Sequence, residues 1–115
     1  MKLADIVNRI VIDPRKLIDY ALDPNNPVDR HKALIFERHL GFTRQNYESL
    51  MQQIESKALA ANAHLKRIDK HGRHYFVDLE IIGTQGQRAV VRTGWLVAPD
   101  SDEARLVTLY VRRRL

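Results

Sequence analysis

The chain has 115 residues, 44% of them hydrophobic and 29% charged, a composition typical of one globular domain with a core of its own. It contains no cysteine, which excludes disulfides, thiolate metal sites and cysteine nucleophiles, and no apolar run approaches the roughly 20 residues that span a bilayer. The formal net charge is +5, and the excess lies in residues 57–115, where eleven Lys or Arg stand against six Asp or Glu; this basicity fits either a polyanionic partner or a solvated surface.

Helix signals occupy the first half of the chain. Asp13-Pro14 is an N-cap followed by proline at the first helical position, and it begins a helix that ends near Asp23-Pro24. Asn26-Pro27 repeats the pattern for a second helix, with Asp29 in its first turn and Gly41 after its last residue. Each predicted helix therefore has a start signal and a stop signal.

A third helix is predicted to begin at Thr43, which can cap it. Its apolar residues recur at helical spacing: Tyr47, Leu50, Met51, Ile54 and Ala58. Helices with one apolar face need a sheet or another helix to cover, and the second half of the chain supplies a sheet.

Strand signals begin at about residue 64 with a short strand that turns at His71-Gly72. Apolar and polar residues then alternate from residue 74 to residue 81, a turn signal follows at residues 83–86, and the next strand runs to Val97. A turn at residues 99–102 leads to the last strand.

These elements predict an α+β fold in a single domain over residues 1–115. Two to three N-terminal helices, at about residues 13–61, pack on one face of a three- to four-stranded antiparallel β-meander at about residues 64–113. The other face of the sheet is expected to be partly open to solvent.

The alternation assigns side chains to the two faces. Core positions in the three long strands are Tyr75, Val77, Leu79, Ile81, Val91, Thr93, Trp95, Val97, Val107, Leu109 and Val111. Open-face positions are His74, Phe76, Asp78, Glu80, Arg92, Gly94, Leu106, Thr108 and Tyr110. A one-residue bulge would reverse part of this assignment.

The residues predicted to be catalytic lie on that open face, and they are His74, Arg92, Thr108 and Tyr110. Together they suit metal-independent RNA cleavage: a histidine can move a proton, an arginine can stabilise phosphate charge, and hydroxyls can bond a phosphate oxygen. An alternative interpretation is that Arg92 pairs with Asp78 across the strands and that His74 is an ordinary surface residue.

Further basic residues are predicted to bind substrate. The segment from His64 to His74 is rich in Lys, Arg and His and includes Arg73, while His31 and Lys32 lie near the N-terminus of the second helix, where free amides favour anions. Arg112, Arg113 and Arg114 could add phosphate contacts. His71 and His74 have no third ligand at a suitable spacing, so no metal and no cofactor are expected.

Several segments together resemble the C-terminal toxin domains of bacterial contact-dependent growth inhibition and related polymorphic toxins, as well as small uncharacterised bacterial proteins. They are Leu22 to Val28, Lys32-Ala33, Phe36, Leu40 to Phe42, Gly72 to Asp78, Val91 to Trp95, and Arg105 to Tyr110. One departure is that the family's usual His-Pro-Val-Gly-Gly segment is Asn26 to Arg30 here.

The resemblance implies a fold like that of the barnase, EndoU, colicin and RelE ribonucleases, and an activity commonly directed at tRNA. It adds Arg105 to the predicted substrate-binding residues, and the positions that it matches to the family are Lys32, His74, Arg92, Thr93, Arg105, Thr108 and Tyr110.

The sequence therefore predicts a ribonuclease toxin domain that cleaves RNA, plausibly tRNA, and that a cognate immunity or antitoxin protein neutralises. Such a domain would act in the bacterial cytoplasm and not at a membrane. Residues 1–5 lack the features of a secretory signal, and a larger secreted parent protein could supply delivery. The alternative is a non-catalytic module that uses the same basic face to bind RNA or a protein.

Overall fold

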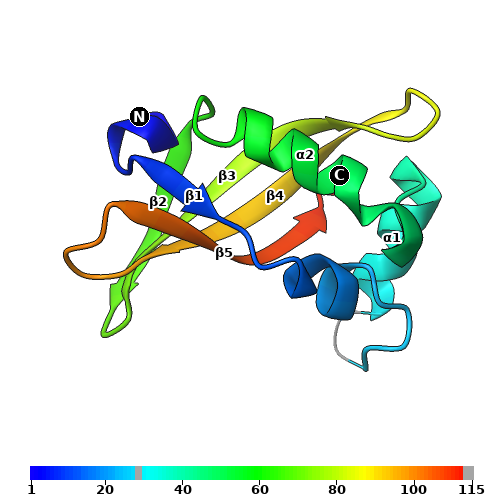
Figure 1. The fold of residues 1–115 in the computed structure, drawn as a ribbon, viewed down its shortest axis with the longest axis horizontal. Helices are drawn as coiled ribbons and strands as arrows, with labels where there is room; N and C mark the ends of the chain where they lie inside the picture. Colours follow the sequence, from blue (N-terminus) through cyan, green and yellow to red (C-terminus); the bar gives the residue numbers. More distant parts are fainter. Residues whose placement is uncertain (28–29, 113–115) are drawn as a thin grey trace.

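A mixed β-sheet with helices on one face forms the molecule in the computed structural model, which describes residues 1–27 and 30–112 (Figure 1). In these residues five strands follow the order β1-β5-β4-β3-β2. The strands are β1 (Arg9–Val11), β2 (Ala63–Asp69), β3 (Gly72–Ile82), β4 (Arg88–Val97) and β5 (Glu103–Val111). The helices are η1 (Leu3–Asp5), η2 (Lys16–Ala21), α1 (Arg30–Leu40), η3 (Arg44–Asn46) and α2 (Tyr47–Lys57). The predicted α+β class is confirmed.

The sheet is not the predicted three- to four-stranded antiparallel meander. Strands β2 to β5 are antiparallel neighbours in chain order, as expected. β1 joins the edge as a parallel neighbour of β5, with Arg9 opposite Glu103 and Val11 opposite Arg105. The prediction missed β1 because three residues are too few to show an alternating pattern.

The helical half differs from the prediction at its start. The Asp13 carboxylate accepts a hydrogen bond from the Arg15 amide at 3.0 Å, and helix η2 begins only at Lys16 and has π-type hydrogen bonding. Helix α1 ends before Gly41, whose φ of +76° suits glycine. Residues 28–29, including the predicted first-turn Asp29, lie outside the described residues. No helix in the described part of the chain is long and apolar enough to cross a membrane.

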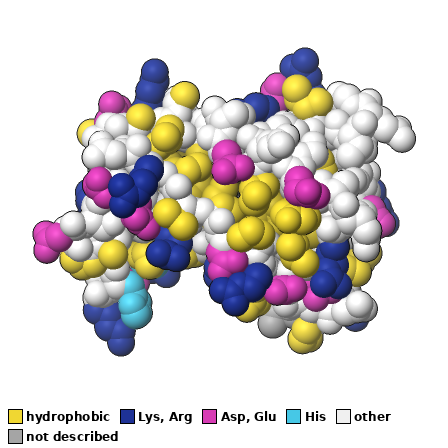
Figure 2. Space-filling view, in the orientation of Figure 1, with side chains coloured by type: hydrophobic (Ala, Val, Ile, Leu, Met, Phe, Trp, Pro, Cys, Tyr) yellow, Lys and Arg dark blue, Asp and Glu magenta, His cyan; other side chains and the backbone are white. Residues whose placement is uncertain are grey.

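Thr43 caps the helical segment formed by η3 and α2, as predicted from the sequence for the third helix. Its side chain accepts a hydrogen bond from the Gln45 amide at the start of η3, which continues directly into α2. Helix α2 lies in front of β3 and β4 in Figure 1. Its side chains Leu50 and Ile54 are buried, so the predicted apolar stripe does pack on the sheet. Figure 2 shows this helix-covered side, where hydrophobic side chains gather in the middle with charged ones around them.

The face assignment is confirmed for β3 and β4 and is partly wrong for β5. All predicted core positions of β3 and β4 are buried, including Thr93 and Trp95. In β5 the register shifts, so that Gly94 pairs with Thr108 but Trp95 pairs with Leu106. Val107 is the extra residue of this bulge and is only half-buried, whereas Leu106 is fully buried and not on the open face as predicted.

Candidate active site on the open sheet face

Strand pairing sets the predicted site residues side by side on the open face. Arg92 lies opposite Asp78 on one side and opposite Tyr110 on the other. In the next row Gly94 lies between Phe76 and Thr108. The sheet therefore brings together three of the four residues predicted to be catalytic, namely Arg92, Thr108 and Tyr110.

The guanidinium of Arg92 is held in a fixed position. Its Nε and Nη2 donate to the two carboxylate oxygens of Asp78 at 2.9 and 3.1 Å, and its Cζ lies 4.0 Å from the centre of the Phe76 ring. Hydrogen bonds from Arg92, with a further contribution from Arg112, lower the pKa of Asp78 below its ordinary value. Asp78 in turn raises the pKa of Arg92. The alternative interpretation was therefore right that these two residues pair, and the pairing leaves Arg92 only partly exposed.

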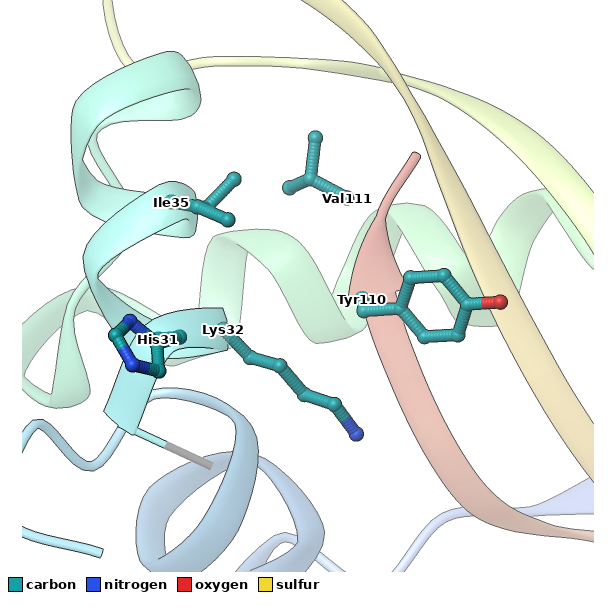
Figure 3. Close-up of a pocket in the computed structure, with 5 residues that line it drawn as sticks. All are labelled: His31, Lys32, Ile35, Tyr110 and Val111. Carbon is teal, nitrogen blue, oxygen red and sulfur yellow. The ribbon is translucent and has the colours of Figure 1, made fainter. Parts of the chain in front are cut away.

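Helix α1 adds a cation, Lys32, beside Thr108 and Tyr110 on β5. β1 pairs with residues 103–105 of β5, and beyond them η2 and α1 lie against the strand. The Lys32 ammonium lies 3.4 Å from the Thr108 hydroxyl oxygen and 5.6 Å from the centre of the Tyr110 ring. Figure 3 shows Lys32 extending from α1 toward Tyr110. Residues 76 positions apart in the chain thus meet at one point.

A cavity of about 340 Å³ opens between α1 and the end of β5. It is lined by His31, Lys32, Ile35, Tyr110 and Val111. Figure 3 shows Ile35 and Val111 between the helix and the strand, while the His31 ring turns away from Tyr110 in this view. The cavity therefore has an apolar interior and a cationic rim, a combination suited to a flat ring that carries an anionic group.

The remaining predicted site residues lie elsewhere. His74 and Arg105 flank Leu96 in a separate row, and Asp78 is four residues from His74 along β3, roughly 13 Å at strand spacing. Arg73 donates to the Tyr75 hydroxyl at 3.0 Å. The structure does not bring His74, Arg73 and Arg105 into the group around Lys32 and Arg92.

His74 has a carboxylate neighbour of its own. Its Nε2 lies 2.9 Å from an Asp69 oxygen, an ion-pair distance without the alignment of a hydrogen bond, and its side chain is 14% exposed. The pKa of Asp69 is lowered to about 2, first by the backbone amide of His71 and then by His74. His74 is thus partly buried beside a carboxylate and is not the free surface residue of the alternative interpretation.

Aromatic stacking on the open face was not part of the predicted site. The rings of His64 and Phe76 are stacked, with centres 4.9 Å apart and planes at 22°, and Arg92 covers Phe76 from the next strand. The alternation did place Phe76 on the open face, where a large aromatic residue is itself a signal of binding. His64 gave no such signal because the short strand β2 shows no clear alternation.

Metal ligands do not gather around the histidine pair of the β2–β3 turn. Among residues 1–27 and 30–112, no group of three or more His, Asp or Glu side chains is placed to hold an ion. His71 and His74 therefore have no third ligand within that part of the chain.

These features define a small α+β protein with helix α2 on one face of a mixed sheet and, on the other face, a cationic, aromatic site to which helix α1 contributes Lys32. Residues 2–113 match the family described as Domain of unknown function (DUF6883), and the chain belongs to this family. No curated protein matches the sequence significantly.

A solved structure shares the fold. It is one chain of a contact-dependent growth inhibition toxin–immunity protein complex from Klebsiella pneumoniae 342, with a TM-score of 0.69 and 19% sequence identity. The similarity covers 90% of this chain and 94% of that chain. The predicted resemblance to proteins of contact-dependent growth inhibition is therefore confirmed at the level of the fold.

Proposed function

We propose that this protein is a toxin domain that cleaves RNA without a metal ion and that a cognate immunity protein neutralises. The observation that carries the proposal is the meeting of Lys32, Arg92, Thr108 and Tyr110, from one helix and two strands, beside a cavity with a histidine at its edge. The fold shared with a chain of a toxin–immunity complex supports the toxin role and a protein partner. The proposed substrate is RNA, and tRNA in particular, in the bacterial cytoplasm.

The proposed reaction is an internal transfer at a phosphodiester. The ribose 2′-oxygen attacks phosphorus and loses its proton to a base, the bond from phosphorus to the 5′-oxygen breaks, and that oxygen takes up a proton. Lys32 and Arg92 stabilise the negative charge on the phosphoryl oxygens, and the Thr108 hydroxyl donates to one of them. Tyr110 orients the scissile group.

His31 is the histidine that lines the cavity, and we propose that it accepts the proton of the 2′-hydroxyl, while the 5′-oxygen takes up a proton from water. His74, which the sequence predicted for this role, is the rival candidate because Asp69 holds it in place. Comparison of the two alanine variants decides between them.

A non-catalytic binding module is the second candidate, and one contact favours it. Asp78 accepts hydrogen bonds from both Arg92 and Arg112, which partly neutralises the cation that catalysis requires. Such a face would bind RNA or a protein partner without cleaving a bond.

The test is cleavage of total RNA and of tRNA by purified protein in EDTA. Lys32→Met and Arg92→Met should each lower the rate about 100-fold or more, as removal of a transition-state contact does. Arg88→Met is the matched control, because Arg88 is also on β4 and pairs with Glu80 where both side chains are more than 60% exposed. Intact RNA with the unaltered protein would contradict the proposed activity.

The histidine variants go through the same assay. His31→Ala should abolish most cleavage, while His74→Ala should retain it if its role is structural. The reverse result would return the proton transfer to His74. Growth arrest on expression, relieved by co-expression of a protein that binds this domain, would test the toxin role separately.

A further inference from the structure

Five side chains form a diagonal row across the open face, one from each of β2, β3, β4, β5 and α1. In order they are His64, Phe76, Arg92, Tyr110 and Lys32, and the step from Phe76 to Arg92 passes from one line of paired residues to the next. We refer to this diagonal row as the cross-strand ladder. It runs across the strands and ends at the cavity beneath α1.

Neighbouring members of the ladder are in contact or in register. His64 stacks on Phe76 with ring centres 4.9 Å apart, and Arg92 lies 4.0 Å above the Phe76 ring. Arg92 and Tyr110 are paired in the sheet, and Lys32 is 5.6 Å from the Tyr110 ring. Aromatic groups and cations thus follow one another along the row.

We propose that the cross-strand ladder binds an unpaired segment of RNA, with the phosphate at Lys32 and Arg92 as its reacting end. This inference rests on the proposed function, which makes RNA the substrate. It adds that the bound RNA is single-stranded. Proteins that bind single strands combine aromatic platforms for the bases with cations for the backbone. The ladder presents both kinds of group.

The length of the ladder sets the length of the bound segment. Strands lie about 4.8 Å apart, so the four strands from β2 to β5 span roughly 14 Å, and α1 extends the row further. This distance suits about four nucleotides, the lower end of the range for single-strand binding folds. Lys66, two residues after His64 on β2, adds positive charge where the segment would leave the sheet, whereas Arg67 pairs with Asp69.

Base pairing would prevent this mode of binding. Because His64 and Arg92 cover the Phe76 ring from the strands on either side, the ring open to a base is that of His64. In a duplex the base faces are stacked on each other and cannot lie on His64 or enter the apolar cavity beside Ile35 and Val111. An unpaired loop or strand offers those faces. We therefore expect cleavage in single-stranded regions and poor binding of duplex RNA.

The test measures binding of fluorescein-labelled 2′-O-methyl RNA of two, four and six nucleotides, which cannot undergo attack by the 2′-oxygen. Affinity should rise from the dinucleotide to the tetranucleotide and then level off. His64→Ala should weaken tetranucleotide binding about five-fold or more, since one stacked base contributes roughly 1–3 kcal/mol, and should leave dinucleotide binding unchanged. His71→Ala is the matched control, because His71 is an exposed histidine in the adjacent turn.

The outcomes separate this inference from the proposed function. Equal affinity at all three lengths, equal effects of the two histidine variants, or equally tight binding of a duplex would overturn the ladder, even if the protein cleaves RNA. Length-dependent binding without any cleavage would support the ladder and overturn the catalytic role. Loss of immunity-protein binding in His64→Ala with RNA binding intact would assign the ladder to that partner and overturn the inference.

Discussion

Arg92 and Asp78 face each other across β4 and β3 and share two hydrogen bonds, at 2.9 and 3.1 Å. About a quarter of each side chain is exposed, and Arg112 adds a third hydrogen bond to the same carboxylate. The pair therefore stabilises the sheet and also fixes the cation of the proposed site. Its two roles can be separated by experiment.

Asp78→Asn should lower the free energy of unfolding by about 1–2 kcal/mol, because charge-assisted hydrogen bonds are lost at a partly buried site. Urea denaturation measures the change. Glu80→Gln, which removes a charge from an exposed pair with Arg88, should cost no more than about 0.5 kcal/mol. Equal losses in the two variants would show that the Asp78 pair contributes no more than an exposed one.

The stability that Asp78 and Asp69 contribute should depend on pH. Both carboxyls have a folded-state pKa below the ordinary value, that of Asp69 being about 2. Their contribution is therefore fully present above about pH 4, the unfolded value, and is lost as the pH falls through the folded value. Urea midpoints of the protein and of Asp78→Asn should converge as the pH falls below about 4. A difference that stays constant over this range would contradict the ionic origin.

Gly94 leaves room for the Thr108 side chain on the neighbouring strand. A Cβ at position 94 would lie 2.7 Å from the Thr108 Cγ2, too close unless one strand shifts. Gly94→Ala should destabilise the protein by about 1–3 kcal/mol, as overpacking does. Thr108→Ser removes that methyl and keeps the hydroxyl, so the double variant should recover most of the loss in a double-mutant cycle. Additive effects would show that the two side chains do not meet.

Thr93 connects two buried polar groups beneath the helices. Its hydroxyl donates to the Val77 carbonyl at 2.8 Å and accepts from the Trp95 indole at 2.7 Å. Thr93→Val should cost about 1–3 kcal/mol, because it leaves the buried Trp95 indole N–H without this partner. Thr93→Ser should cost less, and thermal unfolding followed by Trp95 fluorescence measures both. If the Thr93→Val variant were as stable as the unaltered protein, this account of Thr93 would be wrong.

Local sequence signals predicted most of the elements. Gly41 ended a helix where it was expected to, Thr43 capped the next, and the alternation from His74 to Val97 assigned two long strands to their faces. Arg92 was correctly placed on the open face because a guanidinium is costly to bury alone. These successes depend on interactions within a few residues or on a repeated pattern.

Long-range pairing explains the errors. β1 is too short to show a pattern and exists because β5 offers it an edge. The bulge at Val107 follows from the register between β4 and β5, and it puts the Leu106 side chain on the core face and not on the predicted open face. His74 was grouped with Arg92 because both lie on one face, yet the two rows are separated by several residues along the strand.

The sequence by itself determined the α+β class, the basic second half and the two faces of β3 and β4, since composition and periodicity are local properties. Only the tertiary structure decided which polar residues meet. Lys32 reaches Thr108 and Tyr110 because helix α1 lies against β5, and His64 reaches Phe76 because β2 pairs with β3 in one register. Packing of helix on strand and register of strand on strand are not encoded in any single segment, and they set the geometry of the site.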